Sequence, residues 1–168
     1  MAKPYPKEDH LTGNFAPLRM ESNVDDLIIE GNVPKEILGS YYRNGPDPKF
    51  SPRGGKSHWF GGDGMIHAFH INNGKVSYVN RWMRTVKWLK EHEAGEALFP
   101  SGMDPTDTDP SVQGLKTDGL ANTSIVSHAG KILALEEAHA PFEFDPLTLD
   151  SIGSHTFDNK LEGPVTAH

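Results

Sequence analysis

Nine histidines and no cysteine are the side chains of this 168-residue sequence whose types could bind a metal ion or transfer protons. Without thiolates, the sequence excludes disulfides, iron–sulfur clusters and thiolate zinc sites. His67 and His70 are three residues apart, so on a strand they would lie on opposite faces and could not chelate one ion together. His128, His139 and His155 are scattered, and an isolated histidine is more often a surface or hydrogen-bonded residue. The residues alone predict no metal site.

Motifs for other kinds of chemistry are incomplete. Residues 54–57 imitate the end of a phosphate-binding loop, but Phe50 stands where the first glycine of that motif is required. The Gly62-x-Gly64 pair continues to His67, where a dinucleotide-binding fingerprint needs a third glycine. Glu136 and Glu137 follow the apolar run 132–135, and on residue type alone they indicate a charged strand end.

Charge and hydropathy exclude several classes of protein. The chain has 23 acidic against 16 basic side chains and a formal charge of -7, which argues against a nucleic-acid partner. No apolar stretch approaches the roughly 20 residues that span a bilayer, and the first ten residues lack the apolar core of a signal peptide. We therefore expect a cytoplasmic protein.

Short strands joined by tight turns are the elements that must position these side chains. The 17 glycines and 13 prolines are spread along the chain and act as turn punctuation. The pattern predicts hairpins that pair 65–71 with 75–82, 124–128 with 131–137, and 141–144 with 147–152. It also predicts strands at 27–29 and 40–43, a stiff loop at 44–48 and one short helix within 86–98.

These elements indicate an all-β, antiparallel meander. Strands at roughly ten-residue spacing are typical of a sandwich, a barrel or a propeller. Residues 1–23 are polar and aperiodic, and we expect an extended N-terminal arm there, followed by a single domain over 24–168. The segment 163–168 stops where a strand is expected to begin, so we expect the chain to be truncated.

A series of motifs follows in one order through residues 24–168. They are Gly39-Ser-Tyr-Tyr-Arg-Asn-Gly-Pro46, Phe60-Gly-Gly-Asp-Gly-Met65, Asn80-Arg-Trp-Met-Arg-Thr85, Ala121-Asn-Thr123, His128-Ala-Gly-Lys131, Leu135-Glu-Glu137, Asp145-Pro-Leu-Thr-Leu149 and Thr166-Ala-His168. In type and order they resemble the carotenoid cleavage oxygenase family, which includes apocarotenoid oxygenases, carotenoid cleavage dioxygenases, the retinoid isomerase of vision and lignostilbene dioxygenases.

The resemblance implies a seven-bladed β-propeller of four-stranded antiparallel sheets, of which this chain holds the first blades. It implies a non-haem Fe(II) held by four histidines, and O2-dependent cleavage of a C=C bond into two carbonyl products. His168 matches the first iron-ligating histidine, and Glu137 matches a carboxylate that hydrogen-bonds an iron-bound imidazole and fixes its tautomer. The other three ligands would lie beyond this chain, so we expect the 168 residues alone to be inactive.

The resemblance also bears on the substrate. Phe60 matches a substrate-binding position, whereas the tyrosine and lysine that lignostilbene-type members place near the phenol correspond to Gly102 and Glu136. A carboxylate would repel a phenolate, so we expect an apolar polyene, a carotenoid or apocarotenoid, over a hydroxystilbene. Members of the family take polyenes from membranes, and peripheral membrane contact of the full-length protein follows from the resemblance.

Three alternatives stay open at this point. One is a stilbene-cleaving dioxygenase of the same family. The second is a non-catalytic β-propeller binding module whose iron ligands have been lost. The third is a small independent β-domain, in which His168 has no metal-binding role.

Overall fold

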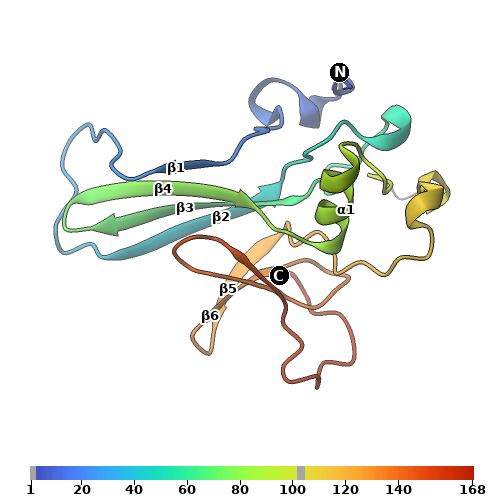
Figure 1. Cartoon of the computed structure of the whole chain (residues 1–168). Helices are drawn as coiled ribbons and strands as arrows, with labels where there is room; N and C mark the ends of the chain where they lie inside the picture. The colour runs from blue at the N-terminus through green and yellow to red at the C-terminus, as the bar shows by residue number, and fades with distance from the viewer. Residues whose placement is uncertain (1–2, 102–104) are drawn as a thin grey trace.

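Two four-stranded antiparallel sheets dominate the computed structural model, which describes residues 3–101 and 105–168 (Figure 1). The first sheet has the order β1-β4-β3-β2 and the second the order β5-β6-β7-β8. The four-stranded antiparallel sheets that the resemblance implied are confirmed. The strands are β1 (Ser22–Val24), β2 (Gly39–Pro46), β3 (Gly64–Asn72), β4 (Lys75–Trp82), β5 (Ser124–His128), β6 (Lys131–Leu135), β7 (Phe142–Phe144) and β8 (Ser151–Ser154).

The helices of the described residues are short. One α-helix, α1 (Val86–Ala94), lies between the sheets in the sequence, as predicted. Its first turn is capped by Thr85, whose side chain accepts a hydrogen bond from the Trp88 backbone N–H. Among the described residues, no helix is long and apolar enough to cross a membrane. Five three-residue 3-10 helices complete the described elements: η1 (Asp9–Leu11), η2 (Gly13–Phe15), η3 (Arg53–Gly55), η4 (Pro105–Asp107) and η5 (Pro110–Val112).

Turn chemistry fixes the two clearest hairpins. Asn73 and Gly74 both have positive φ, 49° and 76°, which matches the right-handed twist of β3 and β4. Ala129 and Gly130 join β5 to β6 with nearly the same angles, 48° and 78°. Both predicted hairpins are confirmed. However, β6 ends at Leu135, two residues before the predicted end.

Three local predictions were wrong. Residues 27–29 form no strand, because Ile28 is 97% exposed and has no core to cover. The strand that pairs with the free edge of β4 is β1, which begins at Ser22 within the segment predicted as an arm. The predicted loop at 44–48 is strand as far as Pro46, which is tolerated because β2 is an edge strand and its proline needs no ladder donor.

The third predicted hairpin has a later second strand. The Asp145 carboxylate accepts hydrogen bonds from the backbone N–H groups of Leu147 and Thr148, both at 2.8 Å. This Asx turn occupies the residues that were predicted to begin the strand. The strand β8 therefore starts only at Ser151.

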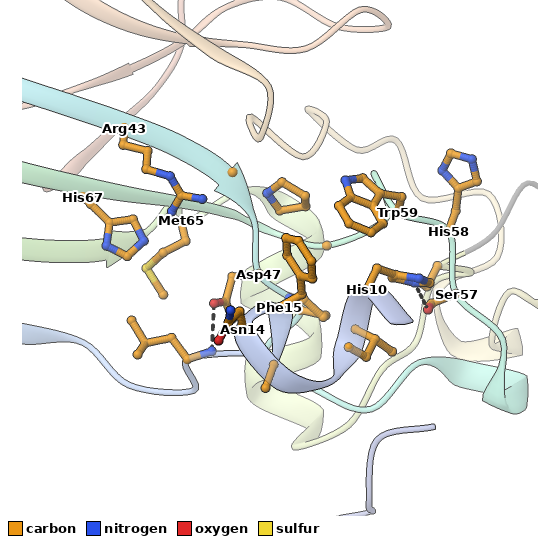
Figure 2. A pocket seen from close by; sticks show the side chains of 18 residues that line it. His10, Asn14, Phe15, Arg43, Asp47, Ser57, His58, Trp59, Met65 and His67 are labelled. Carbon is orange, nitrogen blue, oxygen red and sulfur yellow. Dashed lines mark hydrogen bonds between the residues drawn. The ribbon is translucent and has the colours of Figure 1, made fainter. Parts of the chain in front are cut away.

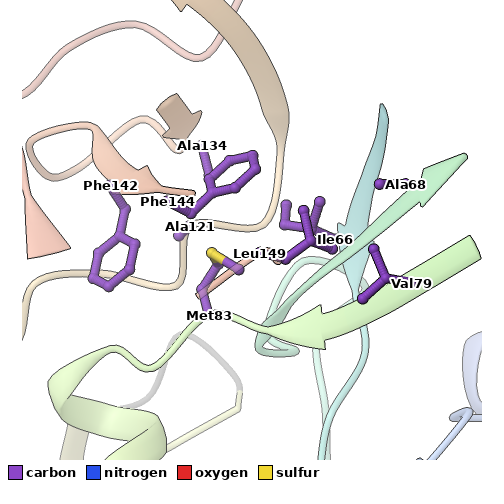
Figure 3. Close-up of a cluster of buried hydrophobic side chains, with 9 residues drawn as sticks. All are labelled: Ile66, Ala68, Val79, Met83, Ala121, Ala134, Phe142, Phe144 and Leu149. Carbon is purple, nitrogen blue, oxygen red and sulfur yellow. The ribbon is translucent and has the colours of Figure 1, made fainter. Parts of the chain in front are cut away.

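An apolar core joins the two sheets (Figure 3). The first sheet contributes Ile66, Ala68 and Val79, and Phe142 and Phe144 of β7 face them from the second. Burying one such phenylalanine contributes about 1.5–3 kcal/mol. The Tyr42 hydroxyl also donates to the Pro146 carbonyl at 2.7 Å, so side chains from β2 reach across to the second sheet. The cluster is completed by Met83, Ala121, Ala134 and Leu149.

A buried ion-pair triad anchors α1. The Lys87 ammonium lies 2.7 Å from Asp63 and 2.8 Å from Glu91, and all three side chains are buried. Glu91 also accepts hydrogen bonds from the backbone N–H groups of Leu98 and Phe99, both at 3.0 Å. The triad thus connects the helix to the loop before β3 and to the segment after the helix.

Candidate functional site

Glu137 and His168 lie next to each other in the structure. Glu137 Oε1 is 3.3 Å from His168 Nε2, and the two side chains are 62% and 77% exposed. A carboxylate beside an imidazole nitrogen favours one orientation of the ring. The structure therefore brings together the two residues that the family resemblance selected, while their part in binding iron stays a prediction.

The backbone that carries His168 is fixed from β5. The Ala167 carbonyl accepts a hydrogen bond of 2.6 Å from the Ser124 hydroxyl, and the Ala167 side chain is buried. Upstream, the Val165 N–H donates to the His139 carbonyl at 3.3 Å. The strand expected to begin in 163–168 is absent from both sheets.

The donor chemistry here fits one ligand of a metal centre. His168 has one ring nitrogen at Glu137, and its second, Nδ1, has no hydrogen-bond partner among the described residues. An imidazole supported by a carboxylate is a suitable donor for Fe(II). Within residues 3–101 and 105–168 there is no group of three or more histidines or carboxylates that could hold a metal ion. The described residues thus supply one ligand and its supporting carboxylate.

Glu136 lies in a different environment from Glu137. Its side chain is only 12% exposed and contacts the imidazole Nδ1 of His139. Gly119 has a φ of +91°, and a Cβ atom there would come within 2.6 Å of Glu136 Oε1. The glycine therefore makes room for the pair. Gly102, which corresponds to the tyrosine near the phenol in lignostilbene-type members, lies outside the described residues.

Phe60 projects from the loop before β3. Its side chain is 61% exposed, and its carbonyl accepts a hydrogen bond of 2.8 Å from the Asn122 amide. The same amide donates to the Gly62 carbonyl at 2.8 Å, so Asn122 holds both sides of the turn. The loop backbone is fixed, and the aromatic ring is left available for a ligand.

The N-terminal arm and this loop enclose a cavity of about 320 Å³, shown in Figure 2. Trp59 packs against the rings of His10 and Phe15, with centroids 5.6 Å and 5.1 Å away. His10 Nε2 lies 2.6 Å from the Ser57 hydroxyl, drawn as a dashed line in Figure 2. No sequence motif signalled these contacts, because they join two short 3-10 helices, η1 and η2, to a loop that is distant in the sequence.

Burial shifts the pKa of two groups in the cavity wall. The pKa of the Asp47 carboxyl is raised, chiefly by burial, although the Leu18 N–H donates to it at 2.9 Å. The pKa of His67 is lowered, first by burial and then by the nearby Arg43 guanidinium. His67 Nδ1 is 2.7 Å from the Tyr78 hydroxyl. His67 belongs to β3 of the first sheet.

Comparisons with known proteins find similarity over nearly the whole chain. The family model described as retinal pigment epithelial membrane protein matches residues 15–168. An isoeugenol monooxygenase from Pseudomonas nitroreducens is 40% identical, over 100% of this chain and 35% of the relative. Lignostilbene-alpha,beta-dioxygenase isozyme III from Sphingomonas paucimobilis is 39% identical, over 98% of this chain and 34% of the relative. Carotenoid 9,10(9',10')-cleavage dioxygenase 1 from Arabidopsis thaliana is 38% identical, over 95% of this chain and 33% of the relative.

Solved structures match over the same region. A lignostilbene dioxygenase from Pseudomonas brassicacearum superposes with a TM-score of 0.92 and 36% identity, over 99% of this chain and 35% of that chain. A cobalt-substituted apocarotenoid oxygenase from Synechocystis superposes with a TM-score of 0.68 and 29% identity, over 89% of this chain and 32% of that chain. The chain spans about a third of the length of the relatives it matches.

Proposed function

The chain belongs to the carotenoid cleavage oxygenase family, and from this premise we propose that the protein containing it is a non-haem Fe(II) dioxygenase that cleaves a conjugated C=C bond with O2 into two carbonyl products. The single observation that carries the proposal is the contact of Glu137 with His168 at 3.3 Å, within a fold that matches family oxygenases. The cobalt-substituted relative supports the use of a metal.

The residues of this chain have distinct tasks in the proposed reaction. His168 would donate one imidazole nitrogen to the iron, which when bound supplies the chemistry of O2 activation. Glu137, whose Oε1 lies 3.3 Å from Nε2, would accept the other ring N–H, orient the imidazole and raise its basicity. Ser124 fixes the backbone through the Ala167 carbonyl. Phe60 presents an exposed aromatic face against which a conjugated substrate can stack.

An aryl alkene of the isoeugenol or stilbene kind is the substrate class that we favour. The names of two relatives and the TM-score of 0.92 with a lignostilbene dioxygenase support it. The Glu136 carboxylate is already engaged by the His139 imidazole within this chain, and its side chain is only 12% exposed, so it is not freely presented to a phenolic substrate.

A carotenoid or apocarotenoid is the second candidate. It is supported by the 38% identity to the Arabidopsis carotenoid dioxygenase, and by Glu136, which leaves no ammonium at that position to stabilise a phenolate. With this substrate, we propose a cytoplasmic protein that contacts a membrane peripherally.

A substrate panel separates the two classes. The full-length protein that contains residues 1–168, reconstituted with Fe(II), would be incubated with isoeugenol, 4-hydroxystilbene and an apocarotenal, and the aldehydes quantified by chromatography. We expect aldehydes from the aryl alkenes at a kcat/KM at least tenfold above that for the apocarotenal. A preference for the apocarotenal would establish the second candidate. The absence of aldehyde from all three substrates would favour a non-catalytic binding module.

A further inference from the structure

A side-chain pair closes the turn that follows β6. Glu136 and His139 are three residues apart, and a carboxylate oxygen of Glu136 contacts His139 Nδ1. Both side chains pack against the backbone of Gly119, where even a Cβ atom would displace them. Glu137 lies inside this turn, so the pair determines the path of the backbone that carries it.

The same turn also holds the segment that ends in His168. The His139 carbonyl accepts the hydrogen bond from the Val165 N–H, three residues before His168. The second fixed point of the segment is the contact between Ser124 and the Ala167 carbonyl. A displacement of His139 would therefore move both partners of the Glu137–His168 contact.

The contact between Glu137 and His168 needs this support. Both side chains are mostly exposed, and an exposed pair contributes little by itself to holding two long side chains in one geometry. Glu136 is the better buried of the two neighbouring carboxylates, with a side chain 12% exposed against 35% for its partner His139. The rigidity must come from the backbone on either side.

We infer that the Glu136–His139 pair positions Glu137 and His168 relative to each other, and so tunes metal binding without touching the metal. The inference rests on the proposed function for the metal, but the positioning itself is a property of this chain. Glu136 and His139 are thus positioning residues.

Substitutions of the pair test the inference in the full-length protein that contains these residues. We expect Glu136→Ala and His139→Ala to accelerate hydrogen exchange of the Val165 amide at least tenfold, and to weaken binding of Co(II) alone about tenfold, the lower end for loss of a supporting partner. Glu136→Gln should behave like the wild type, because its amide oxygen still accepts a hydrogen bond from His139.

His155→Ala is the matched control. It removes another His–Glu contact of the second sheet, 3.3 Å between His155 Nδ1 and Glu143 Oε2. We expect it to leave both Val165 exchange and Co(II) affinity unchanged. The inference is overturned if Glu136→Ala leaves Val165 exchange unchanged, if His155→Ala accelerates it equally, or if Glu136→Gln fails to restore it. Wild-type protein that binds no Co(II) would count against the proposed function, while the exchange rates would still decide the positioning.

Discussion

Glu136 and Glu137 are neighbours in the sequence, but their carboxylates have opposite surroundings. Glu137 is exposed beside His168, whereas Glu136 is largely buried against His139. Residue types alone indicated a charged strand end for both. Only the family resemblance selected Glu137 and His168, because an isolated carboxylate and an isolated histidine do not form a motif with a recognisable spacing. The Glu136–His139 pair could not be predicted, since it depends on the close approach of Gly119.

Asp47 provides a pH-dependent prediction at the scale of one residue. Burial raises the pKa of its carboxyl, so the folded state holds its proton more tightly than the unfolded state does. The free energy of unfolding therefore falls as the pH rises from the unfolded pKa, about 3.9, through the folded one. We expect Asp47→Asn to raise the melting temperature at pH 7, and the gain to disappear below about pH 4.

Asp145→Asn is the control with the opposite sign. The backbone N–H groups of Thr148 and Leu147 lower the pKa of this carboxyl, so it stabilises the fold above its unfolded pKa and loses that effect in acid. We expect Asp145→Asn to lower the melting temperature at pH 7. Melting curves of both variants between pH 3 and pH 8 check these two predictions. Equal shifts for Asp47→Asn at pH 3 and pH 7 would contradict the assignment.

At the scale of the element, α1 depends on the buried charge of Lys87. Lys87→Met leaves Asp63 and Glu91 facing each other without a cation, and breaking a buried pair costs about 3–5 kcal/mol. Lys90→Met on the same helix removes only the exposed pair with Glu93, worth about 0–1 kcal/mol. Chemical denaturation of the two variants measures the difference. An equal decrease in the free energy of unfolding in the two variants would show that the buried triad stabilises α1 no more than an exposed ion pair does.

The N-terminal arm is expected to hold the loop that carries Phe60. His10→Ala removes the contacts with Ser57 and Trp59, so the backbone around Phe60 should open more often. We expect hydrogen exchange of the Gly61 amide, which donates to the His58 carbonyl at 2.9 Å, to accelerate several-fold. Asp9→Ala, at an exposed position of the same arm, is the control. Unchanged exchange in His10→Ala would show that the arm does not hold this loop.

The elements differ in how far the sequence could predict them. The β3–β4 hairpin was predictable because Asn73 and Gly74 favour the required positive φ without help from distant residues. The pairing of β1 with β4 was not predictable, because Ser22–Val24 is short and has one apolar residue, and it forms a strand only by pairing with the edge of β4. The start of β8 was missed because the Asp145 carboxylate binds the backbone of the next residues.

At the scale of the whole molecule, the shared core predicts that the two sheets unfold together. Phe144 is buried between them and contacts Tyr42 of the first sheet edge to face, at 6.1 Å. Phe144→Ala should cost about 3–5 kcal/mol and accelerate hydrogen exchange in β3 and β6 alike. Ile28→Ala, at an almost fully exposed side chain, should change neither. Loss of protection confined to the second sheet would show that the sheets are independent.

We propose that the protein containing this chain is an O2-dependent, iron-using oxygenase in which His168 binds the metal. The most direct measurement is the transfer of label from 18O2 into the aldehyde products of the Fe(II)-loaded full-length protein, compared with its His168→Ala variant and a His155→Ala control. We predict labelled aldehydes from the wild type and the control, with at least a hundredfold less product and a lower iron content in His168→Ala. Labelled product at the wild-type rate from His168→Ala would show that His168 does not bind the catalytic metal.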